Sequence, residues 1–159
     1  MMDGDQLAQL RHFLSQGGAL HMLRDTPRQS LDQLYGYACQ LLQRREYHGA
    51  RNLLQLLVCQ DHWNTDYLLS LGVACQQLQA HDDAIVYFAQ AALILVSDPR
   101  PLWLTAQSTL AQQQWALSQQ ALEGALALAN DGAGWKQLCT LAKQQLIFCL
   151  EQQGDSDES

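Results

Sequence analysis

The short segment CQDHW holds the side chains that come closest to a reactive site. It places Cys59, Asp61 and His62 within four residues. A thiol and an imidazole are the groups used by cysteine nucleophiles and by zinc sites. A nucleophile also needs an oxyanion site, and the helical pattern puts this segment at a turn between two helices, where such a site is not expected. We therefore expect neither catalysis nor metal binding at this segment.

Other signatures of chemistry are not found in the sequence. It has no phosphate-binding loop, no H-E-x-x-H, no G-x-S-x-G and no paired-cysteine metal motif. Its five cysteines are odd in number and form no C-x-x-C pair, a pattern that fits reduced thiols better than a disulfide framework. We predict that the protein is not an enzyme and needs no cofactor and no metal.

Charge and hydropathy exclude two classes of partner, nucleic acid and the membrane interior. The net charge is -7, and the nine Lys and Arg residues form no cationic cluster, so nucleic acid is not an expected partner. The acidic N-terminus does not resemble a signal peptide, and no run of about 18 apolar residues could span a membrane. We expect an intracellular protein that does not insert into membranes.

Apolar residues recur at helical spacing along most of the chain, and the same helical face returns every 34 residues. Starting repeats at Leu31, Thr65 and Pro99 puts small residues at the eighth and twentieth positions and large ones at the twenty-fourth. This period and this pattern are typical of tetratricopeptide repeats, which are helical hairpins that stack on one another. We predict an all-α fold, a tetratricopeptide-repeat superhelix of three hairpins with an N-terminal helix and a C-terminal capping helix.

The repeat boundaries divide the whole chain. We predict an N-terminal helix and linker in residues 1–30, repeats at 31–64, 65–98 and 99–130, a capping helix over 131–151, and a disordered acidic tail at 152–159. The N-terminal helix carries an apolar stripe that either forms a dimer seam or packs on the first repeat. The stripe consists of Leu7, Leu10, Phe13 and Leu14.

The first helix of each hairpin should line a concave groove, through the second, fifth, ninth and twelfth positions of each repeat. A groove this apolar suits an extended peptide with several hydrophobic anchors. It does not suit a C-terminal carboxylate, because Arg100 is nearly the only cation there. For Tyr35 and Trp103, ordinary packing within the hairpins is the alternative. The predicted groove residues are Tyr35, Cys39, Leu42, Asp66, Leu69, Val73, Gln76, Trp103, Gln107 and Leu110.

Several segments appear together in an order that is more specific than the repeat. They are GGALHML, LDQLYGYA, DHWNTDYLLSLG and AIVYFAQAA. In this order the chain resembles the class II chaperones of bacterial type III secretion systems, from about Leu7 to Leu150.

The resemblance implies a cytoplasmic chaperone that keeps hydrophobic, pore-forming translocator proteins soluble before secretion. It implies that an extended N-terminal client segment of Pro-x-Leu-x-x-Pro type binds in the groove, and that the N-terminal helix forms a homodimer. Cys39 stands where the family often has an aromatic residue, so its pocket should be shallower. A generic tetratricopeptide scaffold and an effector-carrying chaperone remain the alternatives.

Overall fold

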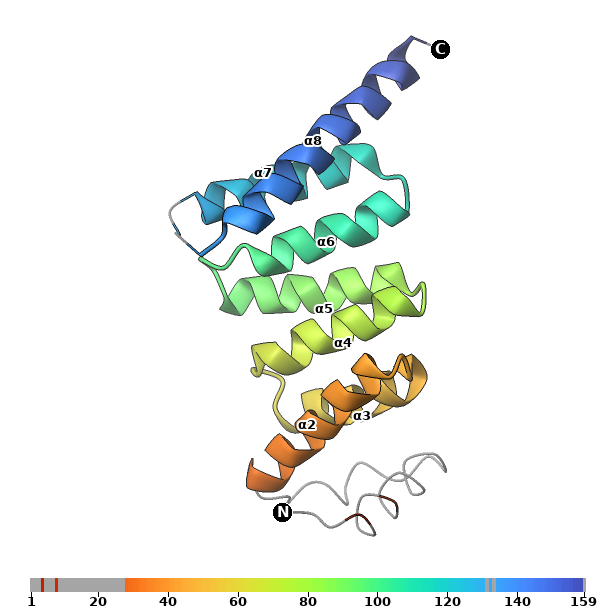
Figure 1. The fold of residues 1–159 in the computed structure, drawn as a ribbon, viewed down its shortest axis with the longest axis vertical. Helices are drawn as coiled ribbons and strands as arrows, with labels where there is room; N and C mark the ends of the chain where they lie inside the picture. Colours follow the sequence, from red (N-terminus) through yellow and green to blue (C-terminus); the bar gives the residue numbers. More distant parts are fainter. Residues whose placement is uncertain (1–3, 5–7, 9–27, 131, 133, 159) are drawn as a thin grey trace. The chain divides into compact units, whose positions relative to one another are not determined.

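The computed structural model describes residues 4, 8, 28–130, 132 and 134–158, and it divides the chain after Leu78 into two compact units. Outside short turns these residues are helical, so the predicted all-α class is confirmed (Figure 1). The candidate dimer stripe (Leu7, Leu10, Phe13 and Leu14) lies outside the described residues. The first unit contains α2 (Arg28–Gln43), α3 (Tyr47–Gln60) and α4 (Thr65–Gln77); the second contains α5 (His81–Ile94), α6 (Arg100–Ala111), α7 (Trp115–Ala129) and α8 (Lys136–Asp157).

In the first unit, α2 packs on α3 and α3 packs on α4, and α2 also contacts α4. The α2–α3 hairpin closes on fully buried alanines, Ala38 in α2 and Ala50 in α3. Because an alanine has only a methyl side chain, two helix backbones can approach closely there. Leu53, Leu54 and Leu57 of α3 then fill the layer beside them.

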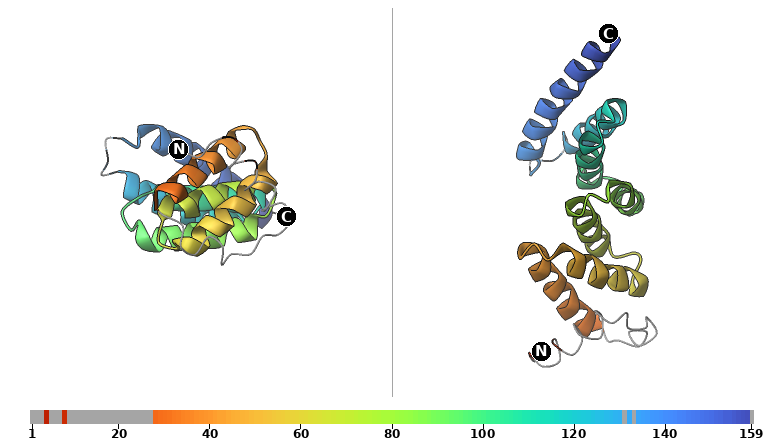
Figure 2. Two further views of the ribbon diagram at one scale, coloured as in Figure 1. Left: turned by 90° about the horizontal axis from the view of Figure 1, so that it is seen from below. Right: turned by 90° about the vertical axis from the view of Figure 1, so that its right-hand side faces the viewer.

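In the second unit each helix packs on the next, from α5 through α8. Its core contains residues from α6, α7 and α8: Ala106, Ala121, Leu122, Ala142 and Cys149. Figure 2 shows α8 lying alongside α7 within this unit and extending beyond it. The helix therefore covers an apolar face that α6 and α7 would otherwise expose.

Buried residues recur at the interval predicted from the sequence. The twentieth repeat position is fully buried in all three repeats, as Ala50, Ala84 and Ser118. In the third repeat this position is polar, but the single hydroxyl proton of Ser118 has two acceptors within reach, Thr109 Oγ1 (2.8 Å) and the Gln114 carbonyl (2.9 Å), which removes the penalty for burying a hydroxyl. The second helix of each hairpin begins on a ring, at Tyr47, His81 and Trp115.

The turn inside each hairpin has one residue in the left-handed conformation. These residues are Arg45 (φ 62°), Gln79 (φ 62°) and Gln113 (φ 59°), and they too are 34 positions apart. After α2, the Arg45 N–H donates to the Leu42 carbonyl and the Glu46 N–H to the Leu41 carbonyl, at 3.1 and 2.9 Å. This is the Schellman pattern, which satisfies carbonyls at a helix end and usually employs glycine. The period is thus present in the backbone even where the side chains differ.

The C-terminal helix is longer than predicted, so the assignment of 152–159 to a disordered tail is corrected. α8 continues past Glu151 to Asp157. Gly154 and the nearby acidic residues disfavour a helix there, but Gln153 Nε2 donates to Gln119 Oε1 of α7 at 3.0 Å. This tertiary contact outweighs the local preference. No helix of the described part of the chain has the length and hydropathy needed to span a bilayer.

Candidate peptide-binding faces

The predicted groove residues fall on two faces, one in each unit. We call the α2 and α4 set the first face: Tyr35, Cys39, Leu42, Asp66, Leu69, Val73 and Gln76. The α6 set is the second face: Trp103, Gln107 and Leu110.

Tyr35 joins the two helices of the first face. Its hydroxyl lies 2.9 Å from Ser70 Oγ and donates to the Asp66 carbonyl at 3.5 Å. Its ring stands 5.2 Å from that of Tyr67, centroid to centroid, at an interplanar angle of 47°. These contacts join Tyr35 to the first helix of the next repeat, so they are contacts between hairpins and not packing within its own hairpin. The side chain is still only half-buried, so part of its ring remains open to a ligand.

Burial shapes the ionisation of this tyrosine pair. It raises the pKa of Tyr35 from 10.0 to about 12, although the hydrogen bond with Ser70 acts in the opposite direction. Burial also raises the pKa of Tyr67, and the carboxylates of Asp32 and Asp61 raise it further. Both phenols therefore stay neutral at physiological pH. Tyr35 thus adds a neutral aromatic group to the first face, in which Asp66 is the charged residue.

The other residues of the first face differ in what they expose. Cys39, Leu42, Val73 and Gln76 are half-buried, and Asp66 is exposed. Leu69 is only 8% exposed, so it forms part of the core beneath the face and offers a peptide little surface. Ser70 and Tyr67, which hold Tyr35 in place, were not among the predicted residues, because an intrahelical period does not show which residues meet across hairpins.

The second face is joined to α8 by a pair of amides. Gln107 Nε2 donates to Gln145 Oε1 at 2.9 Å, and Gln145 Nε2 donates back to Gln107 Oε1 at 2.8 Å. Trp103 and Leu110 pack against the core of this unit, which supports the packing alternative for Trp103. The Trp103 indole N–H is buried without a hydrogen-bond partner in the described part of the chain.

The sequence treated α8 only as a cap, but one of its edges extends the second face. Leu141, Gln145 and Phe148 share this edge, because residues four and seven positions apart in a helix lie on one side. Leu141 and Phe148 are both exposed. Phe148 meets Trp115 of α7 edge to face, with ring centroids 5.6 Å apart. The edge was missed because α8 follows the last complete 34-residue repeat.

The cation near the second face is already paired. Arg100 Nη2 lies 2.7 Å from Asp98 Oδ2, and the Arg100 backbone N–H donates to Asp98 Oδ1 at 2.9 Å. Burial raises the pKa of Asp98, but these bonds from Arg100 act against it and leave that pKa below its usual value. Arg100 is thus not free to bind a client carboxylate. This agrees with the sequence, which indicated that the groove does not suit a carboxylate.

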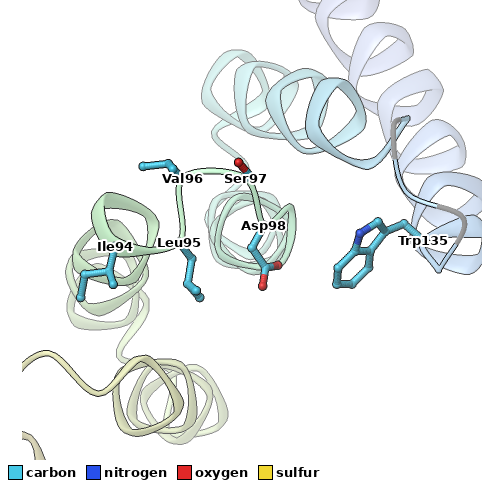
Figure 3. A pocket seen from close by; sticks show the side chains of 6 residues that line it. All are labelled: Ile94, Leu95, Val96, Ser97, Asp98 and Trp135. Carbon is cyan, nitrogen blue, oxygen red and sulfur yellow. The ribbon is translucent and has the colours of Figure 1, made fainter.

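A separate pocket of about 440 Å³ lies beside the turn between α5 and α6. Figure 3 shows Trp135, just before α8, across from Asp98. The lining is Ile94, Leu95, Val96, Ser97, Asp98 and Trp135, with Asp98 as its sole titratable group. It belongs to neither predicted face.

The CQDHW segment spans the last two residues of α3 and the turn after it. Asp61 Oδ1 accepts a hydrogen bond from the Trp63 backbone N–H at 3.3 Å, and the His62 and Trp63 rings are 5.3 Å apart. Cys59 is exposed near the end of α3. The aspartate thus shapes the turn rather than orienting the imidazole, since its carboxylate accepts from the backbone.

Comparisons with known proteins agree with this architecture. The tetratricopeptide repeat family matches residues 31–64, the bounds predicted for the first repeat. Low calcium response locus protein H of Yersinia pestis is 30% identical over 141 residues, which cover 89% of this chain and 83% of that protein.

Solved structures are similar over most of the chain. The Yersinia enterocolitica type III secretion chaperone SycD, in complex with a peptide of the translocator YopD, has a TM-score of 0.77 and 25% identity, covering 81% of this chain and 98% of that one. PcrH from Pseudomonas aeruginosa has a TM-score of 0.77 and 26% identity, with the same coverage of 81% and 98%. The two relatives with these structures are thus matched along almost their whole length.

Proposed function

This chain belongs to the class II chaperone family of bacterial type III secretion systems, and we propose that it binds hydrophobic translocator proteins and keeps them soluble in the bacterial cytoplasm before secretion. The observation that carries the proposal is the likeness to SycD, which was solved with a peptide of the translocator YopD. SycD is a type III secretion chaperone, and a chaperone acts by binding its client.

The first face supports an extended client segment. Half-buried apolar and aromatic side chains stand on two adjacent helices, so they can receive successive anchors of one peptide. Tyr35 has a ring that can pack on an apolar side chain and a hydroxyl that can exchange its partner for a peptide group. We propose Tyr35, Leu42 and Val73 as the principal contacts, with Cys39 and Gln76 beside them.

Binding of a short segment should be moderate. Ordering a flexible peptide costs conformational entropy, so a few anchors give micromolar affinity, on the order of -8 kcal/mol. A complete translocator would bind more tightly by covering further surface, including the second face and its α8 edge. The net charge of -7 then helps to keep the complex dispersed.

A titration of labelled Pro-x-Leu-x-x-Pro peptides, followed by fluorescence anisotropy, tests this proposal. We expect saturable binding by the wild-type chain. Leu42→Ser together with Val73→Ser should weaken it at least about tenfold, which corresponds to about 1.4 kcal/mol. Leu42 and Val73 are preferred to Leu69 because they are only half-buried, so their loss disturbs the fold less.

Val58→Ser is the matched control. Val58 is also half-buried but lies on α3, the second helix of its hairpin, so this variant should bind the peptide like wild type. Circular dichroism of all variants checks that helicity is kept. Equal affinity for a scrambled peptide without prolines, or no effect of the double variant, would contradict the first face as the client site. Failure of every translocator peptide, with binding of a soluble folded partner, would favour the scaffold alternative.

Self-association is the second part of the proposed function. SycD has been solved in an alternative dimer, and we propose that this chain likewise forms a homodimer. The N-terminal stripe of Leu7, Leu10, Phe13 and Leu14 remains a proposed contact for it.

A further inference from the structure

The outer side of α8 carries a second pattern that the fold of its own unit does not use. It is a stripe with the alternating spacing of four and three residues that faces one direction on a helix. Every member is exposed, and Ile147 and Leu150 at its centre are 59% and 48% exposed. We call this set the α8 stripe: Lys136, Thr140, Lys143, Ile147, Leu150, Gly154 and Asp157.

The side of α8 opposite the stripe is already engaged. Ala142 and Cys149 are fully buried on the side that faces the core of the second unit. Gln145 bonds to α6 and Gln153 to α7. In Figure 2 no other helix of the second unit lies against the side of α8 that faces away from α7. The stripe is therefore left over after the unit has folded.

Charge along the stripe changes sign at its centre. Its N-terminal half carries Lys136 and Lys143, and its C-terminal half ends at Asp157, while Glu151 stands beside Leu150 at the border of the stripe. None of these four has an opposite charge three or four residues away on α8, so none is paired along its own helix. This distribution of charge along α8 is complementary to that of a second α8 in antiparallel orientation.

We propose that the α8 stripe is a self-association surface that binds the α8 stripe of a second copy in antiparallel orientation. With Ile147 placed on the two-fold axis, Lys143 faces Glu151 of the other copy, because each lies four residues from the centre. Lys136 lies eleven residues before the centre and so falls opposite Glu158, next to Asp157, and the Lys143 stem covers Leu150. The contact is isologous, so each favourable pair occurs twice.

Size and charge both select this orientation. The same register places Thr140 opposite Gly154, and a side chain added at Gly154 would meet nothing within 4 Å, so the two helices have room to approach at both ends. A parallel pairing would instead bring Lys143 against Lys143 and Asp157 against Asp157. Like charges held this close destabilise a complex, so the parallel form is disfavoured.

The contact should be weak and sensitive to salt. Only two residues of each stripe are apolar, and exposed ion pairs are screened strongly at high ionic strength. We expect a monomer–dimer equilibrium in the micromolar range or above that shifts towards monomer as salt is raised to about 1 M. This surface is independent of client binding, because none of its residues belongs to the first or second face.

Sedimentation velocity of the full chain with charge-reversal variants tests the proposal. Lys143→Glu and Glu151→Lys should each raise the dissociation constant of the α8 contact at least fivefold, because each opposes like charges twice. An equimolar mixture of the two variants should recover wild-type association, since every pair is then opposite in sign. Asp83→Lys, the same charge change as Glu151→Lys at an exposed site on α5, should have no effect.

Cross-linking identifies the contact even if the N-terminal segment also associates. Mixed unlabelled and ¹⁵N-labelled chains, treated with a zero-length carbodiimide reagent, should give a Lys143–Glu151 link that joins one isotope to the other. Within one helix these residues are about 12 Å apart, too far for such a link. Absence of the mixed-isotope link in associated wild-type protein would overturn the proposal. So would a mixture of variants that associates no better than either variant alone.

Discussion

At the scale of single residues, Tyr35 and Leu69 show that neighbouring groove positions can have different roles. Tyr35 holds α2 to α4 through Ser70 and Tyr67 and still exposes part of its ring. Leu69, one residue before Ser70, is almost completely buried. A position in the repeat therefore tells which face a side chain belongs to, but not how much of it a ligand can reach.

The ionisation of Tyr35 should make the protein less stable at high pH. Its pKa in the folded state is about 12, above the value of 10.0 for the free side chain. The stabilising contribution is therefore complete below pH 10 and is lost as the pH rises from 10 to about 12. Urea unfolding across this range should show the decline, and Tyr35→Phe should make it shallower. An equally steep decline in the variant would contradict the assignment.

Truncation of the two leucines should separate packing from binding. Leu69→Ala leaves a cavity and should lower the free energy of unfolding by about 2–5 kcal/mol. Leu42→Ala, at a half-buried site, should lower the free energy of unfolding markedly less. Relative to that loss of stability, it should weaken peptide binding more than Leu69→Ala does. Chemical denaturation of both variants, compared with their peptide affinities, checks this. Equal losses of stability would show that Leu42 is also a core residue.

At the scale of the elements, the hairpin turns are strained in the same place. Arg45, Gln79 and Gln113 each adopt a positive φ, which residues with a Cβ adopt at a cost of roughly 1 kcal/mol relative to glycine. The strain persists because the turn lets the second helix start on its ring residue and pack at once.

Gln113→Gly should therefore stabilise the second unit by about 1 kcal/mol. The Schellman bond from the Gln114 N–H to the Thr109 carbonyl (2.9 Å) does not involve the side chain and should survive the substitution. Gln113→Ala should give no gain, and Gln120→Gly, at an exposed position within α7, should lose about 1 kcal/mol. Thermal unfolding monitored by circular dichroism distinguishes the three variants. A Gln113→Gly chain no more stable than wild type would mean that the turn relaxes in solution.

The elements also show how far the sequence could predict this protein. Small residues such as Ala50 and Ala84 carry the hairpin contacts themselves, so their interval predicts the helices and the buried positions. Contacts between hairpins, such as Tyr35 with Ser70, depend on how two helices cross and leave no periodic signal. The length of α8 was missed for a similar reason, since Gly154 argues against a helix that Gln119 and Gln153 hold in place.

At the scale of the whole molecule, an excess of acidic residues accompanies two faces that expose mainly neutral groups. Acidic residues outnumber basic ones by sixteen to nine, while the first and second faces expose mainly neutral groups. A client can then be covered by apolar contacts while the remaining surface repels other complexes. The proposed chaperone activity depends on both parts at once.

Co-expression with a hydrophobic translocator should reveal this dependence. We expect the wild-type chain to keep the translocator in the soluble fraction, and Leu42→Ser with Val73→Ser to leave most of it in the pellet. Lys143→Glu should retain the translocator as wild type does, because α8 pairing and client binding use different residues. Quantitative gel analysis of both fractions gives the measurement. A double variant that still solubilises the translocator would indicate that the client is held elsewhere.

The three left-handed turn residues have a consequence for how this repeat can diverge. A residue at positive φ tolerates Gly and Asn, accepts long polar chains at some cost, and excludes Pro and the β-branched types. Selection at Arg45, Gln79 and Gln113 therefore acts on the backbone conformation and not on the functional group of the side chain. In a saturation library the same few residue types should be tolerated at these three positions, which are 34 residues apart. The residue types excluded at the turns would then identify the repeat even after the sequences of its helices had diverged.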